Sequence, residues 1–501
     1  MATNLGATDD GWATDGGVYF GFGVTPTKTE PHQSILDEKW EVAPGRMNSY
    51  PSSADLDNSG DRHLVTVGPN GSGKTRRLLI PNLYRLKNWS TVVVDIKGEL
   101  AALTSTYRAA QPGHRVLVID PFGVMTKNYK PLVDKYPYLV SNGYNPIAAL
   151  DPTSEEFPDD ALSLAEALIR EQGQDPHWSQ SAQDLVAAAI MFVRLTMPGG
   201  GSLSDVRALL GQPAEEFRAS VNTMMTAGIE HDCDELTVKA GRFAEITAEN
   251  RELNSVLSTA LTQSRWLDSR PIKADIAKGE FDFSTLKKQP TTIYLILPPR
   301  YLATHSTWLR VMITSILLPL LRSVETERVP VLFMLDEFAQ MGHLAVIENN
   351  MALMRGYGVK LWPVFQDLAQ AKHLYKDRWE SFVGNAGVLQ SFAPQDVTTQ
   401  EYLSKLSGQR LYWLKTGGTS TSQNLGNQPS RSTGTSENLQ NLQGPIYWPQ
   451  GLGAMDVGQA VLFLRERRAR TIRAWLPDPE QKDDPLGIRA HLQRAKREAA
   501  G

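Results

Sequence analysis

The sequence has a single cysteine, Cys233, among its 501 residues. One thiol can form neither an internal disulfide nor a cluster of cysteine ligands for a metal ion. The sequence therefore suits a reducing compartment, and we interpret Cys233 as an inert thiol.

Long hydrophobic runs are also missing. The first residues, MATNLGATDDGWATDGG, lack the basic start and apolar run of a signal peptide. The most apolar stretches, DLVAAAIMFVRLTM and VMITSILLPLLR, are interrupted and fall short of the roughly 18 apolar residues of a membrane span. We predict that both are core helices and that the chain is soluble.

The sequence has no excess of positive charge. Its formal net charge of −4 gives no overall basic signal for nucleic acid, so any such binding must use local patches or the channel of an oligomer. With 501 residues, the chain exceeds the size that one hydrophobic core usually supports, and we expect two or more domains.

What the sequence does have is a glycine-rich turn in VTVGPNGSGKTRRLL. Residues 68–75 fit G-x-x-x-x-G-K-[ST], a loop whose backbone N–H groups point at a phosphate chain. An apolar run precedes the loop and a helical pattern follows it, so phosphates would lie at a helix N-terminus. Lys74 would reach the β and γ phosphates of ATP, and the Thr75 hydroxyl would bind Mg²⁺. The alternative is a turn that only resembles this motif. The predicted nucleotide-binding residues are Gly68, Pro69, Asn70, Gly71, Ser72, Gly73, Lys74 and Thr75.

A second candidate stretch, VLFMLDEFAQ, ends an apolar run with Asp336 and Glu337. In α/β folds, ligands bind at the carboxyl ends of the strands, where these acids are expected. Asp336 would hold Mg²⁺ through its water shell, and Glu337 would act as the base that polarises the attacking water. The alternative is a pair of solvated carboxylates at a strand end.

Two further side chains complete the predicted catalytic set of Lys74, Glu337, Gln366 and Arg355. Gln366 ends the strand KLWPVFQD, where its amide could sense the γ phosphate or hold the attacking water, or could simply cap the strand. Arg355 lies in ALMRGYGVKLW, one helix after the acids, where it could reach the nucleotide of a neighbouring subunit, or could be a surface arginine.

The order of predicted elements indicates an α/β fold with a mostly parallel sheet, interrupted by helices. Valine-, isoleucine- and leucine-rich runs alternate with helical patterns before about residue 150 and again after about residue 285. Between these positions only helical patterns occur. We predict an extended lead-in at 1–60 with a short strand at VYFGFGV and no transmembrane segment, a nucleotide-binding domain at 61–150 and 286–480, an all-alpha domain at 151–285, a flexible loop at 415–440 and a basic tail at 481–501.

The sequence DEFAQMGHL resembles the VirD4/TraG family of coupling proteins of bacterial type IV secretion and conjugation. PNGSGKT, VVDIKGEL, the YNP at 144–146 and PVFQDLAQ share this resemblance, which covers residues about 63 to 475. The resemblance implies a RecA-like P-loop ATPase domain that carries an all-alpha domain and assembles into a hexameric ring around a central channel. It also implies partners, namely a relaxase bound to single-stranded DNA, or protein effectors, and the components of the secretion channel.

The resemblance assigns roles to the same residues as above, with Arg355 as the finger that acts in trans. It also suggests that Asp95, Lys97 and Glu99 in VVDIKGEL serve the nucleotide pocket or the ring interface, although they could be ordinary charges at a strand end. Trp178, in the stretch that matches the entry to the helical domain, is expected in the core rather than as a platform for stacking bases.

The chain departs from the family in one respect. Most members begin with membrane-spanning helices, and this sequence shows none, so we expect either a soluble member or a separate partner that supplies the membrane anchor. The expected location is the cytoplasm, at the inner membrane through partners. The leading hypothesis is an ATPase that pumps relaxase-bound single-stranded DNA into the channel. The alternatives are a receptor for protein effectors without DNA transport, and a P-loop ATPase of chromosome partition or DNA packaging.

Overall fold

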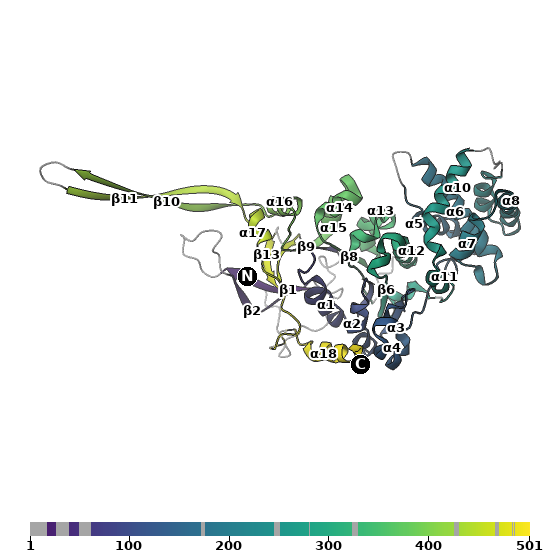
Figure 1. Ribbon diagram of the computed structural model, residues 1–501, viewed down its shortest axis with the longest axis horizontal. Helices are drawn as coiled ribbons and strands as arrows, with labels where there is room; N and C mark the ends of the chain where they lie inside the picture. The colour runs from purple at the N-terminus through teal and green to yellow at the C-terminus, as the bar shows by residue number, and fades with distance from the viewer. Residues whose placement is uncertain are drawn as a thin grey trace.

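The computed structural model has a large sheet at its centre, with helices gathered at one end and a long hairpin at the other (Figure 1). It describes residues 18–26, 40–49, 62–171, 176–244, 251–279, 281–322, 329–424, 430–465, 470–482, 484 and 486–500.

Seven parallel strands form the core of an eleven-stranded sheet. All but the edge strand β5 are buried along their whole length, as expected for continuous apolar runs covered by helices on both faces. The predicted α/β class with a mostly parallel sheet is confirmed. In spatial order, the parallel strands are β9 (Ala386–Phe392), β3 (His63–Val67), β8 (Val359–Phe365), β7 (Val331–Leu335), β4 (Ser90–Asp95), β6 (Thr291–Ile296) and β5 (Arg115–Ile119).

Four antiparallel strands extend the sheet beyond β9. They are β12 (Gln459–Leu464), β13 (Arg470–Trp475), β1 (Tyr19–Pro26) and β2 (Trp40–Ser49), in that order. β1 agrees with the strand predicted at VYFGFGV, but β2 was not predicted. The lead-in assigned to 1–60 is therefore corrected for its described part, which joins the sheet. WEVAPGRMNS lacks a regular apolar alternation, and its strand is defined by backbone pairing with β1.

The described residues between β5 and β6 form helices and no strand. This agrees with the helical patterns in the sequence, while the boundaries of the domain at 151–285 stay a prediction. α6 lies at the centre of this group and carries the DLVAAAIMFVRLTM stretch, most of which is buried. The helices that follow α3 (Val124–Asn128) and α4 (Lys130–Lys135) are α5 (Phe157–Leu168), α6 (His177–Thr196), α7 (Leu203–Leu210), α8 (Ala214–Glu230), α9 (Asp234–Gly241), α10 (Arg251–Ser264) and α11 (Arg270–Ile276).

Two side chains of this helical group test the sequence predictions. Cys233 is buried as a free thiol, in line with an inert role. Trp178 is 36% exposed, so its assignment to the core is wrong. Trp178 occupies the first turn of α6, where its ring meets the edge of His177 at 5.2 Å between centroids.

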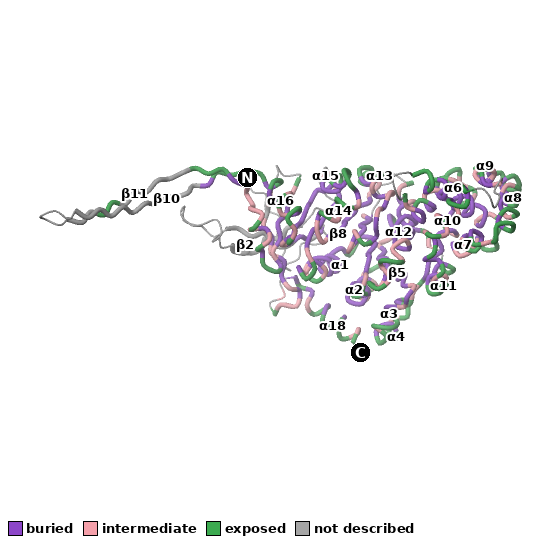
Figure 2. The backbone as a smooth tube through the Cα atoms, turned by 45° about the horizontal axis from the view of Figure 1, so that its top comes forward, coloured by how far each residue is buried: buried purple, intermediate pink, exposed green. Residues whose placement is uncertain are grey.

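The remaining helices cover the sheet, and the strands and helices at its centre are buried (Figure 2). α12 (Pro299–Arg322) contains VMITSILLPLLR, and its long buried stretch confirms the prediction of a core helix. No helix in the described part of the chain is both long and apolar enough to cross a membrane. The others are η3 (Lys74–Leu79), α1 (Ile80–Arg85), α2 (Glu99–Ala109), η7 (Phe283–Lys287), η8 (Phe338–Met341), α13 (Ala345–Met354), η9 (Arg355–Tyr357), α14 (Leu368–Tyr375), α15 (Glu380–Asn385), α16 (Val397–Leu406) and α17 (Pro449–Gly453).

The C-terminal segment predicted as a basic tail forms the helix α18 (Arg489–Ala500). This helix packs against α2 and α4 with Leu492 and Ala495 buried, and the Lys135 Nζ atom lies 2.8 Å from the Glu498 Oε1 atom. The segment is therefore part of the folded body and not a free tail.

The flexible loop predicted at 415–440 is wrong for the described residues. β10 (Gln409–Asn424) and β11 (Ser430–Pro445) pair in an unbroken antiparallel register, from Gln409 opposite Pro445 to Asn424 opposite Ser430. The hairpin extends away from the body (Figure 1). Its serine-, threonine-, glycine- and asparagine-rich sequence shows no apolar alternation because a projecting ribbon has no core to cover, while backbone hydrogen bonds can form with almost any side chains.

Candidate nucleotide site

The glycine-rich loop connects β3 to the helix that begins at Lys74. Gly68 N donates a hydrogen bond to Phe365 O at 3.0 Å, which ties the start of the loop to the end of β8. Gly73 has a φ of +91°, and a Cβ atom there would lie 2.8 Å from the Arg77 Cδ atom. Position 73 therefore requires glycine both for its backbone conformation and for space.

Lys74 lies over its own loop. The side chain is buried, and its Nζ atom donates to the carbonyl oxygens of Gly68 and, at 3.1 Å, of Pro69. Burial lowers the pKa of Lys74, and the nearby carboxylates of Glu337 and Asp336 oppose that shift. The ammonium group is thus held among groups that a phosphate could replace as hydrogen-bond partner.

The loop offers further donors that suit a phosphate chain. The Ser72 Oγ atom is buried and has no hydrogen-bond partner in the described part of the chain. Thr75, in the first helical turn, is partly exposed. An unpaired buried hydroxyl is costly unless a ligand or water completes it, so residues 68–75 fit a nucleotide triphosphate and its metal ion.

The two acids follow β7 directly. Glu337 N donates to Asp336 Oδ1 at 3.0 Å, and Glu337 has a φ of +51°, a left-handed conformation that is uncommon for residues other than glycine. Such strained backbone concentrates at functional sites. This backbone conformation ends β7. It turns the Glu337 side chain toward Gln366, which follows the neighbouring strand β8.

Gln366 meets Glu337 at this edge of the sheet. The Gln366 Nε2 atom donates to Glu337 Oε2 at 2.7 Å. β8 lies between the loop-bearing strand β3 and the acid-bearing strand β7, so Gln366 lies between the phosphate loop and the acids. The structure therefore brings together Lys74, Asp336, Glu337 and Gln366, as the sequence predicted.

Asp336 lies in an unfavourable place for a negative charge. Burial first, and then the neighbouring Glu337, raise the pKa of Asp336 to about 6, while Lys74 and Lys97 oppose the shift. A divalent cation next to this carboxylate would relieve the repulsion between the two acids.

Asp95 contributes from the neighbouring strand β4. Its carboxylate accepts hydrogen bonds from Ala101 N at 2.8 Å and Lys97 N at 3.3 Å, and thus caps the start of α2. Burial raises the pKa of Asp95 to about 7, and the charge of Asp336 adds to the shift. Asp95 is therefore a structural cap beside the candidate site, whereas Lys97 and Glu99 are exposed.

Arg355 is not brought together with the phosphate loop of its own chain. It is exposed in η9, before the first residue of β8, whereas Gln366 follows the last residue of that strand. Because a strand rises about 3.3 Å per residue, Arg355 and Gln366 are separated by roughly 20 Å or more, at opposite ends of the parallel strands. Within one chain Arg355 cannot reach the phosphates, so a finger in trans and a surface arginine both stay predictions.

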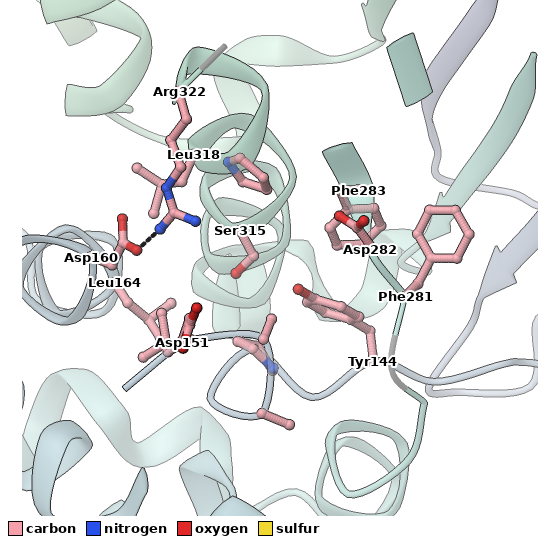
Figure 3. Close-up of a pocket in the computed structure, with 15 residues that line it drawn as sticks. Tyr144, Asp151, Asp160, Leu164, Phe281, Asp282, Phe283, Ser315, Leu318 and Arg322 are labelled. Atoms are coloured by element: carbon pink, nitrogen blue, oxygen red, sulfur yellow. Dashed lines mark ion pairs between the residues drawn. The ribbon is translucent and has the colours of Figure 1, made fainter. Parts of the chain in front are cut away.

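A cavity of about 460 Å³ lies away from the loop (Figure 3). It opens beside α5 and α12, where Asp160 and Arg322 form an ion pair, and the Tyr144 of the YNP at 144–146 lines it. None of residues 68–75 lines this cavity. The pair of Asp160 and Arg322 was missed from the sequence because its members are far apart in the chain and share no motif.

The raised pKa of Asp336 predicts a gain in stability for Asp336→Asn. An acid with a raised pKa prefers its protonated form in the folded state, so the folded state is destabilised as the pH rises from about 4 to about 6. In buffer without nucleotide or Mg²⁺, Asp336→Asn should stabilise the chain at pH 7.5 by about 2 kcal/mol, after a discount for the partial exposure of this side chain. The difference in melting temperature should shrink toward pH 4.5. A variant that melts at or below the temperature of the unaltered chain at pH 7.5 would contradict this account.

Sequence comparison decides the family. The family model described as "Type IV secretory system Conjugative DNA transfer" matches residues 32–475. The chain belongs to this family. The conjugal transfer protein TraG of Escherichia coli is 27% identical over 418 residues, which cover 79% of this chain and 62% of the relative. The protein VirD4 of Agrobacterium fabrum is 26% identical over 422 residues, which cover 82% of this chain and 58% of the relative. The resemblance to VirD4/TraG is confirmed, and the matched part of the chain spans about three fifths of the length of these relatives.

Solved structures of a bacterial conjugative coupling protein show the fold. The bacterial conjugative coupling protein TrwB, in an unbound form, aligns with a TM-score of 0.62 at 12% identity, covering 93% of this chain and 95% of that chain. TrwB in complex with ADP and Mg²⁺ aligns with a TM-score of 0.59 at 13% identity, covering 92% and 94%. The predicted RecA-like P-loop fold is confirmed.

Proposed function

We propose that this chain is an ATPase of conjugative DNA transfer that couples ATP hydrolysis to the movement of relaxase-bound single-stranded DNA into a type IV secretion channel. The observation that carries the proposal is the meeting of Lys74, Asp336, Glu337 and Gln366 at one edge of the sheet, in a chain of this family. TrwB, which shares the fold, has been solved with ADP and Mg²⁺ and with a non-hydrolysable ATP analogue.

Each residue has a proposed role in hydrolysis. The Lys74 ammonium exchanges its bonds to Gly68 and Pro69 for bonds to the β and γ phosphates, and neutralises part of their charge. Glu337 accepts a proton from the attacking water, and Gln366, through its bond to Glu337, fixes the orientation of that carboxylate. Thr75 and Asp336 would hold Mg²⁺, which when bound neutralises charge on the β and γ phosphates.

The proposed assembly is a homo-hexameric ring in which Arg355 of one subunit reaches the nucleotide of the next. Its place at the far edge of its own sheet supports this role, because the distance excludes action on the phosphates of its own chain. The proposed partners are the relaxase with its DNA strand, the channel components and a membrane-anchored protein that holds the ring at the inner membrane.

The test is ATP hydrolysis by the purified chain with and without single-stranded DNA. Turnover should rise several-fold with DNA and fall to background in Lys74→Ala, because the variant loses the charge that holds the phosphates. A strand longer than the ring's pore and a matched duplex should be compared, since a DNA pump is expected to respond to the single strand. Hydrolysis that depends on Lys74 but is indifferent to DNA would overturn the DNA part of the proposal and point to protein cargo.

A further inference from the structure

A groove of about 400 Å³ lies between α2 and α18, on the first half of the nucleotide-binding fold. Small side chains line it and leave it open, namely Ala109 at the end of α2, Ala110 just after it and Ala495 of α18. Aromatic rings and one guanidinium group surround these alanines. We call this site the α2–α18 groove, with the lining residues Tyr84, Tyr107, Tyr136, Tyr138, His491 and Arg494.

The rings of the α2–α18 groove form two groups. Tyr107 is central in the first, with ring centroids 4.6 Å from Tyr84 and 4.9 Å from His491, which it meets edge-on. Tyr136 and Tyr138 form the second, with centroids 5.9 Å apart. Tyr138 is 36% exposed and His491 is exposed, so aromatic surface faces solvent in both groups.

The hydroxyl groups of the tyrosines divide them by role. The Tyr84 hydroxyl donates to Leu103 O at 2.6 Å, and the Tyr136 hydroxyl oxygen lies within 3.5 Å of both Glu498 carboxylate oxygens. In the described part of the chain, the hydroxyls of Tyr107 and Tyr138 have no hydrogen-bond partner. Tyr84 and Tyr136 are thus fixed by the fold, whereas Tyr107 and Tyr138 keep donors available to a ligand.

One cationic side chain, that of Arg494, lines the α2–α18 groove, in a chain whose net charge is −4. The Arg494 Nε atom lies 3.1 Å and the Lys135 Nζ atom 2.8 Å from the same Glu498 carboxylate, so two cations share one acid. α18 as a whole carries four cationic side chains, those of Arg489, Arg494, Lys496 and Arg497, and a single acid. Lys496 pairs with Glu480, and the remaining cations give α18 a local excess of positive charge, which nucleic-acid binding needs when the overall charge is acidic.

We infer that the α2–α18 groove binds single-stranded DNA, with unpaired bases against Tyr107, Tyr138 and His491 and the backbone phosphates near Arg494. Stacking on aromatic rings beside a basic rim is the general means of holding single strands without sequence preference. A duplex hides the faces of its bases, and an acidic peptide would use the cations but not the rings. The inference rests on the proposed function and names the surface that would hold its substrate.

The α2–α18 groove is separate from the candidate nucleotide site. α2 begins at Glu99, next to the cap formed by Asp95, and the groove lies at its other end, from Thr106 onward. At 1.5 Å per residue, α2 places the two sites roughly 15 Å apart. Substitutions in the groove should therefore leave basal ATP hydrolysis unchanged.

The test is binding of a labelled oligo-dT, about 20 nucleotides long so that it exceeds common single-strand site sizes. Anisotropy with the full chain should show that Tyr138→Ala combined with His491→Ala weakens binding at least about tenfold, since each ring contributes severalfold. Arg494→Ala should weaken binding and reduce the slope of log affinity against log salt by about 0.7. Because both substituted rings are partly exposed and each contacts one group of tyrosines, the melting temperature should fall only slightly.

Two matched controls remove an exposed ring and an exposed cation elsewhere, Trp178→Ala in α6 and Arg218→Ala in α8, and both should bind the strand normally. If the double variant binds DNA as well as the unaltered chain and DNA still stimulates hydrolysis, the inference fails while the proposed function stands. If the unaltered chain neither binds the strand nor responds to it, both fail. If poly-glutamate displaces the oligo-dT from the unaltered chain, and does so equally well from the double variant, the groove is a site for acidic proteins and the inference is overturned.

Discussion

Replacing Glu337, the proposed base, by glutamine is expected to reduce the kcat for ATP by about 10²–10⁴-fold, the usual contribution of a positioned general base. The substitution keeps the shape of the side chain, and the amide oxygen can still accept the hydrogen bond from Gln366 Nε2. ATP should therefore bind as well as before, because Lys74 and the glycine-rich loop are unchanged. Steady-state hydrolysis together with nucleotide binding by fluorescence titration would measure both effects.

Two variants separate the loss of the base from other effects of Glu337→Gln. Glu401→Gln replaces an exposed acid of α16 and should hydrolyse ATP normally. Gln366→Ala keeps the base but removes the hydrogen bond that orients it, so its turnover should fall less than that of Glu337→Gln. If Glu337→Gln turned over ATP at the normal rate, the carboxylate would not be the base.

Removing Arg355 is expected to have an effect of similar size, but only in the assembled ring. A finger supplied by a neighbouring subunit is typically worth ~10³-fold or more, so Arg355→Ala should lose turnover by about that factor while each subunit still binds ATP. The reason is geometric, since Arg355 and the phosphate loop lie at opposite ends of the parallel strands, so the proposed contact has to form between subunits.

Mixed assemblies provide the sharpest test of this role. Lys74→Ala and Arg355→Ala should each be inactive alone. When the two are mixed, some interfaces join an intact Arg355 from the first variant to an intact Lys74 of the second, and hydrolysis should reappear in proportion to those interfaces. An exposed arginine such as Arg378, replaced by alanine, serves as the control and should leave turnover unchanged. Failure of mixed rings to recover any activity would show that Arg355 does not act in trans.

The placement of the residues of the candidate nucleotide site was largely predictable because its parts are local. Residues 68–75 fit a loop motif between a strand and a helix, and the structure has that strand and helix. Asp336 and Gln366 each end a buried strand, and parallel strands in one sheet align their carboxyl ends at one edge. The sequence could not show that β8 lies between β3 and β7. This strand order brings the Gln366 Nε2 atom to 2.7 Å from the Glu337 Oε2 atom.

The errors arose where local composition carried little information. The hairpin of β10 and β11 has no apolar alternation because it covers no core, so its sequence resembled a loop. Trp178 was assigned to the core from its residue type, but the first turn of α6 leaves it 36% exposed. β2 depends on its pairing with β1, and no feature of WEVAPGRMNS reveals such a partner.

The sequence by itself determined the α/β class, the phosphate loop, the strand-end acids and the family, because these depend on residue types at fixed spacing within short segments. Only the tertiary structure decided which strands are neighbours and that α18 docks on α2 and α4. It also placed Arg355 at the end of the strands opposite to the loop. It brought the four tyrosines of the α2–α18 groove together with His491 and Arg494. The physical reason is that these contacts join segments distant in the chain, and their free energy comes from packing, backbone pairing and charge complementarity that no single segment contains.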